Sequence, residues 1–434
     1  MKMLIKNANI LPVQNDVSEL LHGCIGIEND KISFIGSCPD FFKPDRIIDA
    51  EDGIVLPGLV NAHTHLAMSL FRHYADDLSF WDWLFGRIVP AEEKLNATHV
   101  YNGTMLSLVE MIKSGTTCLS DMYFYMDAVA MALEKSGLRA NLSRGLSFSD
   151  DKDLYKLEET RAFYDKWNGR ASGRILVDVA PHAIYTCGPE YLKKTADLAK
   201  SLNTRIHIHL SESIKELEDC YKLYGKSPVA HARDLGLFEA PCYAAHCVHL
   251  SNEDIEILKN HSVSVVHNPA SNLKLANGIA PVKELLDAGI NLALGTDGAA
   301  SNNNLDMFEE INLAALLAKG KSKEPKTLSA YQALQMATIK GAKALGIDNI
   351  TGSLEPGKKA DLIIVDTTAP HFYPRNSASA SLVYGAGGAD VKTLVCNGQL
   401  LMENRQLLLL DENEIYAKAE ESCMKLVGSS GFGP

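Results

Sequence analysis

The sequence lacks several features that would point to particular classes of protein. It has no Cys-x-x-Cys pair, no apolar run of membrane-spanning length and no excess of basic side chains. The 42 lysines and arginines are outnumbered by 54 aspartates and glutamates, for a formal net charge of −12. Phosphate recognition needs clustered cations, so the composition argues against a nucleic-acid partner. The absence of a long apolar run argues equally against a membrane partner.

The nine cysteines are scattered, and the amino terminus lacks the apolar core and cleavage site of a signal peptide. We therefore expect reduced thiols in a cytoplasmic protein. At 434 residues and 46% hydrophobic content, the chain can bury one large core and an accessory module.

The pattern between residues 57 and 350 alternates apolar strand-like runs with amphipathic helical segments. This alternation is typical of a parallel sheet with crossover helices. Eight runs are found, which predicts an α/β protein with a (β/α)8 TIM-type barrel. The expected strands are Gly58–Ala62, Thr116–Ser120, Arg139–Leu142, Ile175–Ala180, Ile206–Leu210, Tyr243–Ala245, Ser264–Val266 and Asn291–Leu294.

The sequence pattern of the two chain ends differs from that of the middle. Residues 1–56 and 351–434 contain short strand patterns separated by turn signals, and we expect them to join in one small composite β-sandwich domain. Glu412–Val427 has helical spacing, and the Gly- and Ser-rich residues 428–434 are expected to be a flexible tail.

Two histidines one residue apart, His63 and His65, close the first barrel strand. Side chains alternate along a strand, so both imidazoles lie on one side of it. His209 and Asp297 stand at two later strand ends. Three histidines and an aspartate suit a divalent ion such as Zn²⁺ with a position open for water. His207 shares a face with His209, and spacing alone does not choose between them.

These residues lie in a set of ordered blocks, among them PGLVNAHTH (57–65), HLSES (209–213), AAHCVHL (244–250), HNPASNLKL (267–275) and GTDGAASNN (295–303). The set resembles the amidohydrolase superfamily and, within it, the methylthioadenosine/S-adenosylhomocysteine deaminase group, over essentially the whole chain. The resemblance implies the barrel with a composite sandwich, and it favours His209 as the third histidine ligand.

The resemblance also implies an activity, the metal-dependent hydrolytic deamination of an adenosine-type nucleoside to its inosine analogue and ammonia. Glu212 would transfer protons to the ring, while His246 and Asp297 would help to activate the water. From the residues alone, Glu212 could instead be a carboxylate at a helix start, and His246 a satisfied core histidine. No lysine ends the fourth strand, before Pro181, so the bridging ligand of binuclear members is missing and one metal ion is expected.

Substrate contacts follow in part from the resemblance. It assigns the ribose hydroxyls to Glu92, with Glu93 as the neighbouring alternative, and the ring or sugar to His182. Arg144 at the end of the third strand could pair with the carboxylate of S-adenosylhomocysteine. A second family arginine is replaced in the segment that begins at Lys156, which weakens that interpretation and favours methylthioadenosine or 5′-deoxyadenosine.

Trp83, and less so Trp81, lies in the long loop after the first barrel strand and could stack on a purine. For both, ordinary loop packing is an equally good interpretation.

Several alternatives remain open at this stage. The scaffold could act on another heterocycle, such as guanine, cytosine, a pterin or a triazine, or it could be a catalytically silent interaction protein. Zn²⁺ is the first choice of metal, with Fe²⁺ or Mn²⁺ as alternatives, and a homo-oligomer is possible. A small-molecule nucleoside is the expected binding partner.

Overall fold

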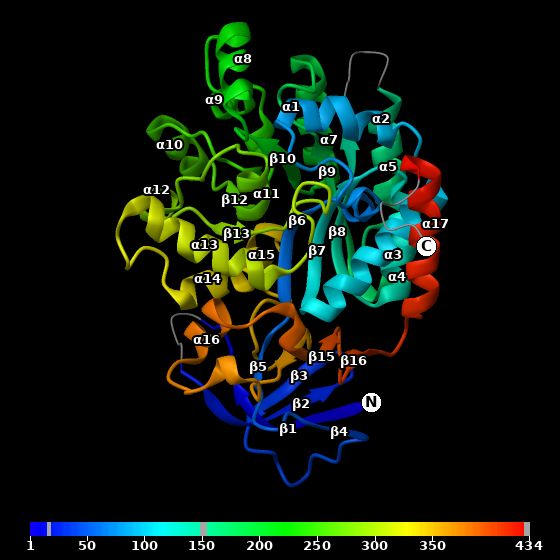
Figure 1. Ribbon diagram of the computed structural model, residues 1–434, viewed down its shortest axis with the longest axis vertical. Helices are drawn as coiled ribbons and strands as arrows, with labels where there is room; N and C mark the ends of the chain where they lie inside the picture. The colour runs from blue at the N-terminus through cyan, green and yellow to red at the C-terminus, as the bar shows by residue number, and fades with distance from the viewer. Residues whose placement is uncertain (15–18, 148–153, 429–434) are drawn as a thin grey trace.

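The computed structural model describes residues 1–14, 19–147 and 154–428, and its centre is a barrel of eight parallel strands (Figure 1). The strands follow one another around the barrel in sequence order, which confirms the predicted fold. They are β6 (Leu59–Thr64), β7 (Thr116–Tyr123), β8 (Arg139–Leu146), β9 (Ile175–Pro181), β10 (Ile206–Leu210), β11 (Cys242–His246), β12 (Ser264–His267) and β13 (Leu292–Leu294).

The barrel closes through side chains as well as backbone. Between β6 and the end of β13, Asn61 Nδ2 donates to Thr296 Oγ1 at 2.7 Å and Thr296 N donates to Asn61 Oδ1 at 3.0 Å. Asp297 N donates to His63 O at 3.0 Å. A Cβ at Gly295 would lie 2.8 Å from the backbone of His63, so only glycine allows this approach. The seam therefore fixes Asp297 beside the first histidine.

Helices pack around the outside of the barrel (Figure 1). Their ends carry clear sequence signals: Asn96 caps the start of α3, Ser251 forms a capping box on α10, and Gly115 and Gly137 end α3 and α4 in the left-handed conformation. The helices are α3 (Ala97–Ser114), α4 (Met126–Ser136), α5 (Tyr155–Trp167), α6 (Arg170–Gly173), α7 (Pro189–Leu202), α8 (Ile214–Tyr224), α9 (Pro228–Asp234), α10 (Asn252–Asn260), α11 (Pro269–Lys274), α12 (Val282–Asp287), α13 (Met307–Ser322), α14 (Ala330–Met336) and α15 (Ile339–Leu345).

The connection from β6 to α3 is long, as the sequence indicated, but it is partly helical. It contains the short helices α1 (Phe80–Trp83) and α2 (Val89–Glu92). Ser79 caps α1 by accepting a hydrogen bond from Asp82 N, a local signal that the sequence prediction missed. These two helices place Trp83 and Glu92 above the carboxyl ends of the barrel strands.

Strands from both chain ends form one hydrogen-bonded sheet beneath the barrel, which confirms the composite domain (Figure 1). Its members are β1 (Lys2–Ile10), β2 (Leu21–Glu28), β3 (Lys31–Gly36), β4 (Arg46–Asp49), β5 (Ile54–Pro57), β14 (Leu362–Val365), β15 (Val391–Cys396), β16 (Gln399–Glu403) and β17 (Gln406–Leu407). The last two helices pack on barrel helices instead, α16 (Ala378–Tyr384) against α13 and α14 and α17 (Glu412–Val427) against α3 (Figure 1). The domain boundaries at residues 56 and 350 stay predictions, and the predicted tail beyond residue 428 lies outside the described residues.

A buried ion pair ties the sheet to the barrel. Arg139 at the start of β8 donates through Nε to Asp361 Oδ2 at 3.0 Å, and both side chains are almost fully buried. Asn397 N donates to the other oxygen of Asp361. Removing either charge would leave its partner buried and unpaired, so this contact helps to fix how the sheet sits on the barrel.

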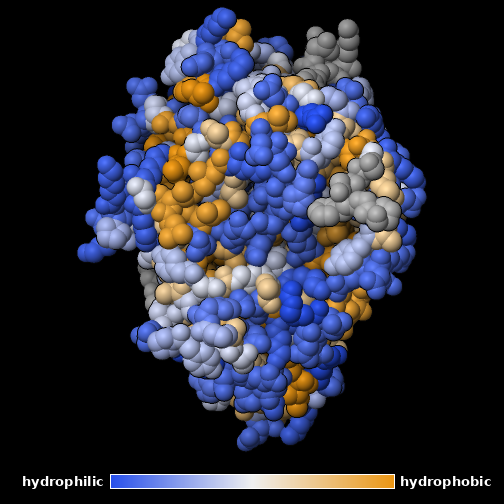
Figure 2. All heavy atoms as spheres, viewed as in Figure 1, coloured by the Kyte–Doolittle hydropathy of each residue, from blue (hydrophilic) through white to orange (hydrophobic). Residues whose placement is uncertain are grey.

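The surface in Figure 2 is mostly hydrophilic, and the most extensive of its apolar areas is at the left, over the region of α11 to α13. Leu273 and Leu316 are the large apolar side chains there that stand exposed, at 39% and 49%. In the described part of the chain, no helix is both long and apolar enough to cross a membrane. No described contact bears on the homo-oligomer that the sequence analysis named as an option.

Candidate active site

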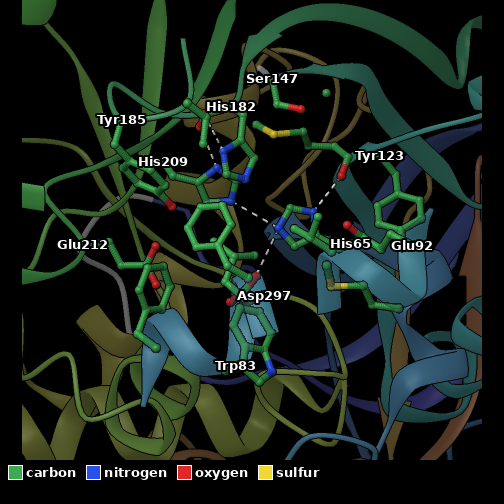
Figure 3. A pocket seen from close by; sticks show the side chains of 18 of the residues that line it. His65, Trp83, Glu92, Tyr123, Ser147, His182, Tyr185, His209, Glu212 and Asp297 are labelled. Carbon is green, nitrogen blue, oxygen red and sulfur yellow. Dashed lines mark hydrogen bonds and ion pairs between the residues drawn. The ribbon is translucent and has the colours of Figure 1, made fainter. Parts of the chain in front are cut away.

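A cavity opens at the carboxyl ends of the barrel strands, with about 750 Å³ of empty space when its open mouth is included (Figure 3). This is the end of a barrel where catalytic residues gather. Much of the wall is aromatic or sulfur-containing, and the polar groups converge on one point, as is typical of small-molecule sites. The apolar part of the lining includes Met68, Phe80, Trp83, Leu84, Phe85, Val89, Met122, Phe124 and Tyr185.

The four predicted metal ligands lie together at the floor of this cavity. One ligand atom from each of His63, His65, His209 and Asp297 lies within 4.8 Å of the others, and all four side chains are buried. Nε2 of His63 and Nε2 of His65 lie 3.3 and 3.2 Å from Asp297 Oδ1. Within the described residues this is the one group of such side chains close enough to hold an ion.

Hydrogen bonds fix which nitrogen of two imidazoles is free to bind. His65 Nδ1 lies 2.6 Å from Met122 O, and His209 Nδ1 lies 2.8 Å from His182 O. A carbonyl oxygen only accepts, so both Nδ1 atoms carry the proton. The two Nε2 atoms, 3.2 Å apart, therefore turn lone pairs toward each other.

Two facing lone pairs repel each other unless a cation lies between them. A tetrahedral Zn²⁺ with bonds of about 2.0–2.1 Å sets neighbouring nitrogens about 3.3 Å apart. The observed spacing of 3.2 Å matches that value. The residues present therefore fit a divalent ion.

Asp297 is held so that one oxygen points at the histidines. Its Oδ2 accepts hydrogen bonds from Ser271 Oγ at 2.6 Å and from Ser301 Oγ at 2.7 Å, which leaves Oδ1 toward His63 and His65. Burial raises its pKa, but the neighbouring imidazoles outweigh that effect and hold the pKa well below its usual range. Its φ of 61° lies in the left-handed region, a strain that local hydrogen bonds maintain.

His207 is not a member of the ligand group. Its Nε2 lies 2.7 Å from Nδ1 of His63, on the side of that ring away from Asp297. The geometry therefore favours His209 over His207, as the resemblance implied.

Glu212 follows β10 and lies in the cavity wall next to the cluster (Figure 3). Asn277 Nδ2 donates to Glu212 Oε1 at 2.9 Å, and Oε2 lies 3.7 Å from His246 Nε2. Burial, helped by the charges of Asp297 and Glu216, raises the pKa of Glu212 well above its ordinary value. A carboxyl that keeps its proton near neutral pH can act as a general acid.

The structure argues against the alternative interpretation of Glu212 as a carboxylate at a helix start. Ser213 is the N-cap of α8, and the acidic residue in the first turn is Glu216. Glu216 accepts hydrogen bonds from Ser211 N at 3.0 Å and Glu212 N at 2.7 Å, so it shapes the turn that presents Glu212. Glu212 itself is left free to face the cavity.

His246 ends β11 beside the cluster. Its Nδ1 lies 2.8 Å from Asn272 Oδ1, which accepts, so Nε2 keeps a lone pair toward the cavity. The backbone at His246 is left-handed, with φ of 72°. Burial lowers its pKa, and Nε2 is therefore available to take a proton from water.

Glu92 lies across the cavity from Glu212, with the ligand cluster between them (Figure 3). Its Oε1 is buried and has no hydrogen-bond partner among the described residues. Burial raises the pKa of Glu92 to about 7, although the neighbouring Tyr123 hydroxyl opposes the shift. Glu93 lines only an outer hollow beside the cavity. The geometry thus favours Glu92 over Glu93 as the acceptor for a ligand.

His182 and Trp83 both line the cavity. His182 Nδ1 lies 2.9 Å from Thr186 Oγ1, and its ring centre lies 4.6 Å from that of His209. Trp83 donates from Nε1 to Ala300 O at 3.3 Å and is buried. Trp81 instead stacks on Phe85, behind the lining.

Arg144 does not line the cavity. It lies in the adjoining outer hollow, where its Nη2 pairs with Glu159 Oε2 at 2.7 Å. Lys156 donates from Nζ to Ser147 O at 2.8 Å. The predicted carboxylate contact, Arg144, and the nearby Lys156 therefore both have partners within the protein.

Sequence reasoning missed several residues that shape the site. Tyr123 and Tyr185 line the cavity, and Ser271, Asn272 and Asn277 hold Asp297, His246 and Glu212. A signal was present for three of them: Tyr185 lies in the segment PHAIYTC (181–187), and Ser271 and Asn272 lie in the block HNPASNLKL. Both segments contribute to the family resemblance, but these three residues were assigned no role.

Comparison with known proteins identifies the family. The model of the amidohydrolase family matches residues 54–401. The chain belongs to this family. It is 49% identical to a 5-methylthioadenosine/S-adenosylhomocysteine deaminase of Caldanaerobacter subterraneus subsp. tengcongensis, over 98% of this chain and 99% of that one. It is 48% identical to a 5′-deoxyadenosine deaminase of Methanosarcina acetivorans, over 98% of both chains. The resemblance proposed from the sequence is confirmed.

Solved structures agree with this assignment. An adenosine deaminase from Xanthomonas campestris with bound zinc is 34% identical, with a TM-score of 0.93 over 98% of each chain. An atrazine chlorohydrolase from Arthrobacter aurescens complexed with zinc is 25% identical, with a TM-score of 0.90 over 97% of this chain and all of that one. The same amidohydrolase scaffold thus occurs in proteins named for different heterocycles.

Proposed function

We propose that this amidohydrolase catalyses the hydrolytic deamination of an adenosine-type nucleoside, giving the inosine analogue and ammonia. The substrates in question are 5′-methylthioadenosine, S-adenosylhomocysteine, 5′-deoxyadenosine and adenosine. Relatives that match nearly the full chain at 48–49% identity carry the names of deaminases for three of these compounds. An adenosine deaminase structure shares the whole fold.

The observation that carries the proposal is the placement of two carboxyl groups on opposite sides of one cavity. Glu212, with a raised pKa, lies beside the ligand cluster. Glu92 lies on the far side with an unpartnered buried oxygen. A purine ring directed toward Glu212 would place its ribose near Glu92, whose carboxylate can accept hydrogen bonds from two vicinal hydroxyls. A bare base would leave Glu92 without a partner.

We propose Zn²⁺ as the metal, held by His63, His65, His209 and Asp297, with Fe²⁺ or Mn²⁺ as alternatives. The donor set of imidazoles and one carboxylate suits these ions, and related structures contain zinc. A divalent ion bound there lowers the pKa of water from about 15.7 toward about 7, and so supplies a nucleophile at neutral pH.

The protein's own groups carry the protons. His246 Nε2 and Asp297 Oδ1 face the same space and take the proton from the attacking water. Glu212 donates a proton to the ring nitrogen as water adds to C6. The proton taken from the water passes to the amino group, which leaves as ammonia, and the C6 hydroxyl returns a proton to Glu212 as the carbonyl forms. Asn277 holds Glu212 in place during this transfer. His182 and Trp83 line the cavity where the ring would bind, and they would orient it.

We expect metal-replete protein to release ammonia from the four adenosyl compounds and to leave guanine and cytosine unchanged. The reason is that Glu92 and the aromatic lining match a nucleoside rather than a free base. Coupled ammonia detection with chromatography of the inosine product measures this directly. Turnover of guanine, cytosine or a triazine alone would move the function to another heterocycle, the reaction class that the relation to atrazine chlorohydrolase makes the second candidate.

The outer hollow around Arg144 favours a substrate with an uncharged 5′ substituent. A homocysteine carboxylate would have to displace Glu159 from Arg144, whereas a methylthio group or hydrogen needs no such exchange. We expect Glu159→Gln to raise kcat/KM for S-adenosylhomocysteine about two- to fivefold, the range of a partly exposed ion pair worth roughly 0.5–1 kcal/mol. The value for methylthioadenosine should stay within about twofold.

Glu158→Gln is the matched control, since this exposed neighbour lies outside the hollow around Arg144. Equal changes for both substrates in Glu159→Gln would contradict a role of this ion pair in selecting the 5′ group.

A further inference from the structure

A row of buried polar side chains runs through the barrel interior beneath the ligand cluster. His207, Ser120, Tyr243 and Asp178 come from four different strands, and each is at most 1% exposed. Barrel interiors are usually filled by apolar side chains. Buried polar groups are kept only where they are hydrogen-bonded, so the partners of this row reveal what it does.

The row is continuous and starts at a metal ligand. His63 Nδ1 lies 2.7 Å from His207 Nε2, and His207 Nδ1 lies 3.4 Å from Ser120 Oγ. Ser120 Oγ lies 2.8 Å from the Tyr243 hydroxyl, which donates to Asp178 Oδ2 at 2.9 Å. The rings of His207 and Tyr243 stack with centres 4.4 Å apart. A chain of contacts thus leads from the cavity floor to a carboxylate deep in the barrel.

The ligand end fixes the direction of every hydrogen bond in the row. His63 turns Nε2 toward Asp297 Oδ1, so a metal ion would bind at Nε2 and the ring proton must sit on Nδ1. His63 then donates to His207 Nε2, which places the proton of His207 on Nδ1. His207 donates in turn to Ser120, and Ser120 passes its single proton to the Tyr243 oxygen.

The hydrogen bonds at the Asp178 end of the row require the same donor-to-acceptor direction, independently of the His63 end. Asn141 Nδ2 donates to Asp178 Oδ2 at 2.8 Å and to Leu345 O at 3.3 Å, so the amide nitrogen faces both acceptors. Asp178 Oδ2 therefore accepts from Asn141 and from Tyr243. Burial raises the pKa of Asp178 above its ordinary value, while the hydrogen bonds from Asn141 and Tyr243 oppose this shift and favour the ionised, acceptor-only form. Both ends thus agree on a single arrangement of protons.

We propose that Ser120, Tyr243 and Asp178 are positioning residues that act through His207 to hold His63 in its metal-binding tautomer. Imidazole ligands usually donate their second nitrogen to a carboxylate, a carbonyl or water. His63 donates to another imidazole, which has no tautomer preference of its own unless its far side is fixed. The buried carboxylate of Asp178, acting through Tyr243 and Ser120, sets the tautomer of His207. This inference rests on the metal site proposed above and not on the choice of substrate.

The test is zinc affinity, measured by titrating apo-protein against a competing chelator. Tyr243→Phe keeps the ring that stacks on His207 and removes only the hydroxyl. We expect its zinc Kd to rise about tenfold or more, the usual size of such outer contacts, and Ser120→Ala to behave alike. Ser143→Ala is the matched control, because this buried barrel serine donates to the backbone oxygen of Asp121 instead. Its Kd should stay within about twofold.

A second measurement separates positioning from general stability. Nitrogen-15 spectra of imidazole-labelled apo-protein should show His207 protonated on Nδ1 in the wild type and a mixture of tautomers in Tyr243→Phe. Activity lost by the variant at limiting zinc should return at saturating zinc.

Two results would overturn the inference. One is a variant with a lower unfolding temperature of the apo-protein but an unchanged zinc Kd. The other is an unchanged His207 tautomer in Tyr243→Phe. Failure of the wild type itself to bind zinc would instead reject the metal site.

Discussion

Glu212→Gln should lower the rate of ammonia release by about 10²- to 10⁴-fold, the range expected when a general acid is lost. The amide has nearly the same shape and can still contact Asn277, but it cannot give a proton to the ring nitrogen. Because Glu212 is not in the ligand group, the variant should bind one equivalent of metal as the wild type does. Its affinity for the nucleoside should change little.

The control for this variant is Glu218→Gln, an exposed carboxylate on α8. It should keep full activity, so that any loss in Glu212→Gln is assigned to the site. Ammonia release, metal content and nucleoside binding are measured on the same preparations. If Glu212→Gln kept more than about a tenth of wild-type activity, Glu212 would not be the proton donor. A loss accompanied by lost metal would assign it a supporting role instead.

The barrel was predictable because the sequence carries two kinds of signal, the pattern of a strand and, at several strand ends, a residue suited to metal binding or catalysis. Ile206–Leu210 alternates apolar residues with His207 and His209 and is followed by a turn that carries Glu212, and the strand has the predicted bounds. His63 and His65 share one face because side chains alternate along a strand. Since catalytic groups gather at the carboxyl ends of barrel strands, these local patterns were enough to bring distant residues into one site.

Side-chain partners were not predictable in this way. Alternation shows which face a residue occupies but not which neighbour it meets across the barrel. The pairing of Arg144 with Glu159 depends on how α5 packs beside β8, and the contact of His207 with His63 depends on the closure of the barrel. In the sequence, Tyr123 resembles an ordinary strand residue. Its place in the site depends on α2, which positions Glu92 next to it. In our proposals these contacts bear on specificity and metal binding, and they arise from tertiary packing.

Removal of the metal should abolish turnover and lower stability together. Chelated protein should lose at least about 100-fold in activity, and one equivalent of Zn²⁺ should restore it. Binding to the folded state alone stabilises it by about 4 kcal/mol when free zinc is 1,000 times Kd, so the unfolding temperature should rise on reconstitution. One equivalent is expected because β9 ends in Pro181 and offers no lysine to bridge two ions.

A pair of histidine variants locates this metal within the protein. His209→Ala removes a proposed ligand whose Nε2 faces that of His65, so we expect it to bind less than about a tenth of an equivalent of zinc after dialysis. His231→Ala removes an equally buried imidazole of α9, which stacks on Tyr224 of α8 and lies outside the ligand group, and it should bind one full equivalent. Wild-type zinc content in His209→Ala would show that the ion binds elsewhere, and two equivalents in the wild type would contradict a mononuclear site. Because the two variants lose the same side chain, a difference between them reports the position of the imidazole rather than the mere loss of a buried ring.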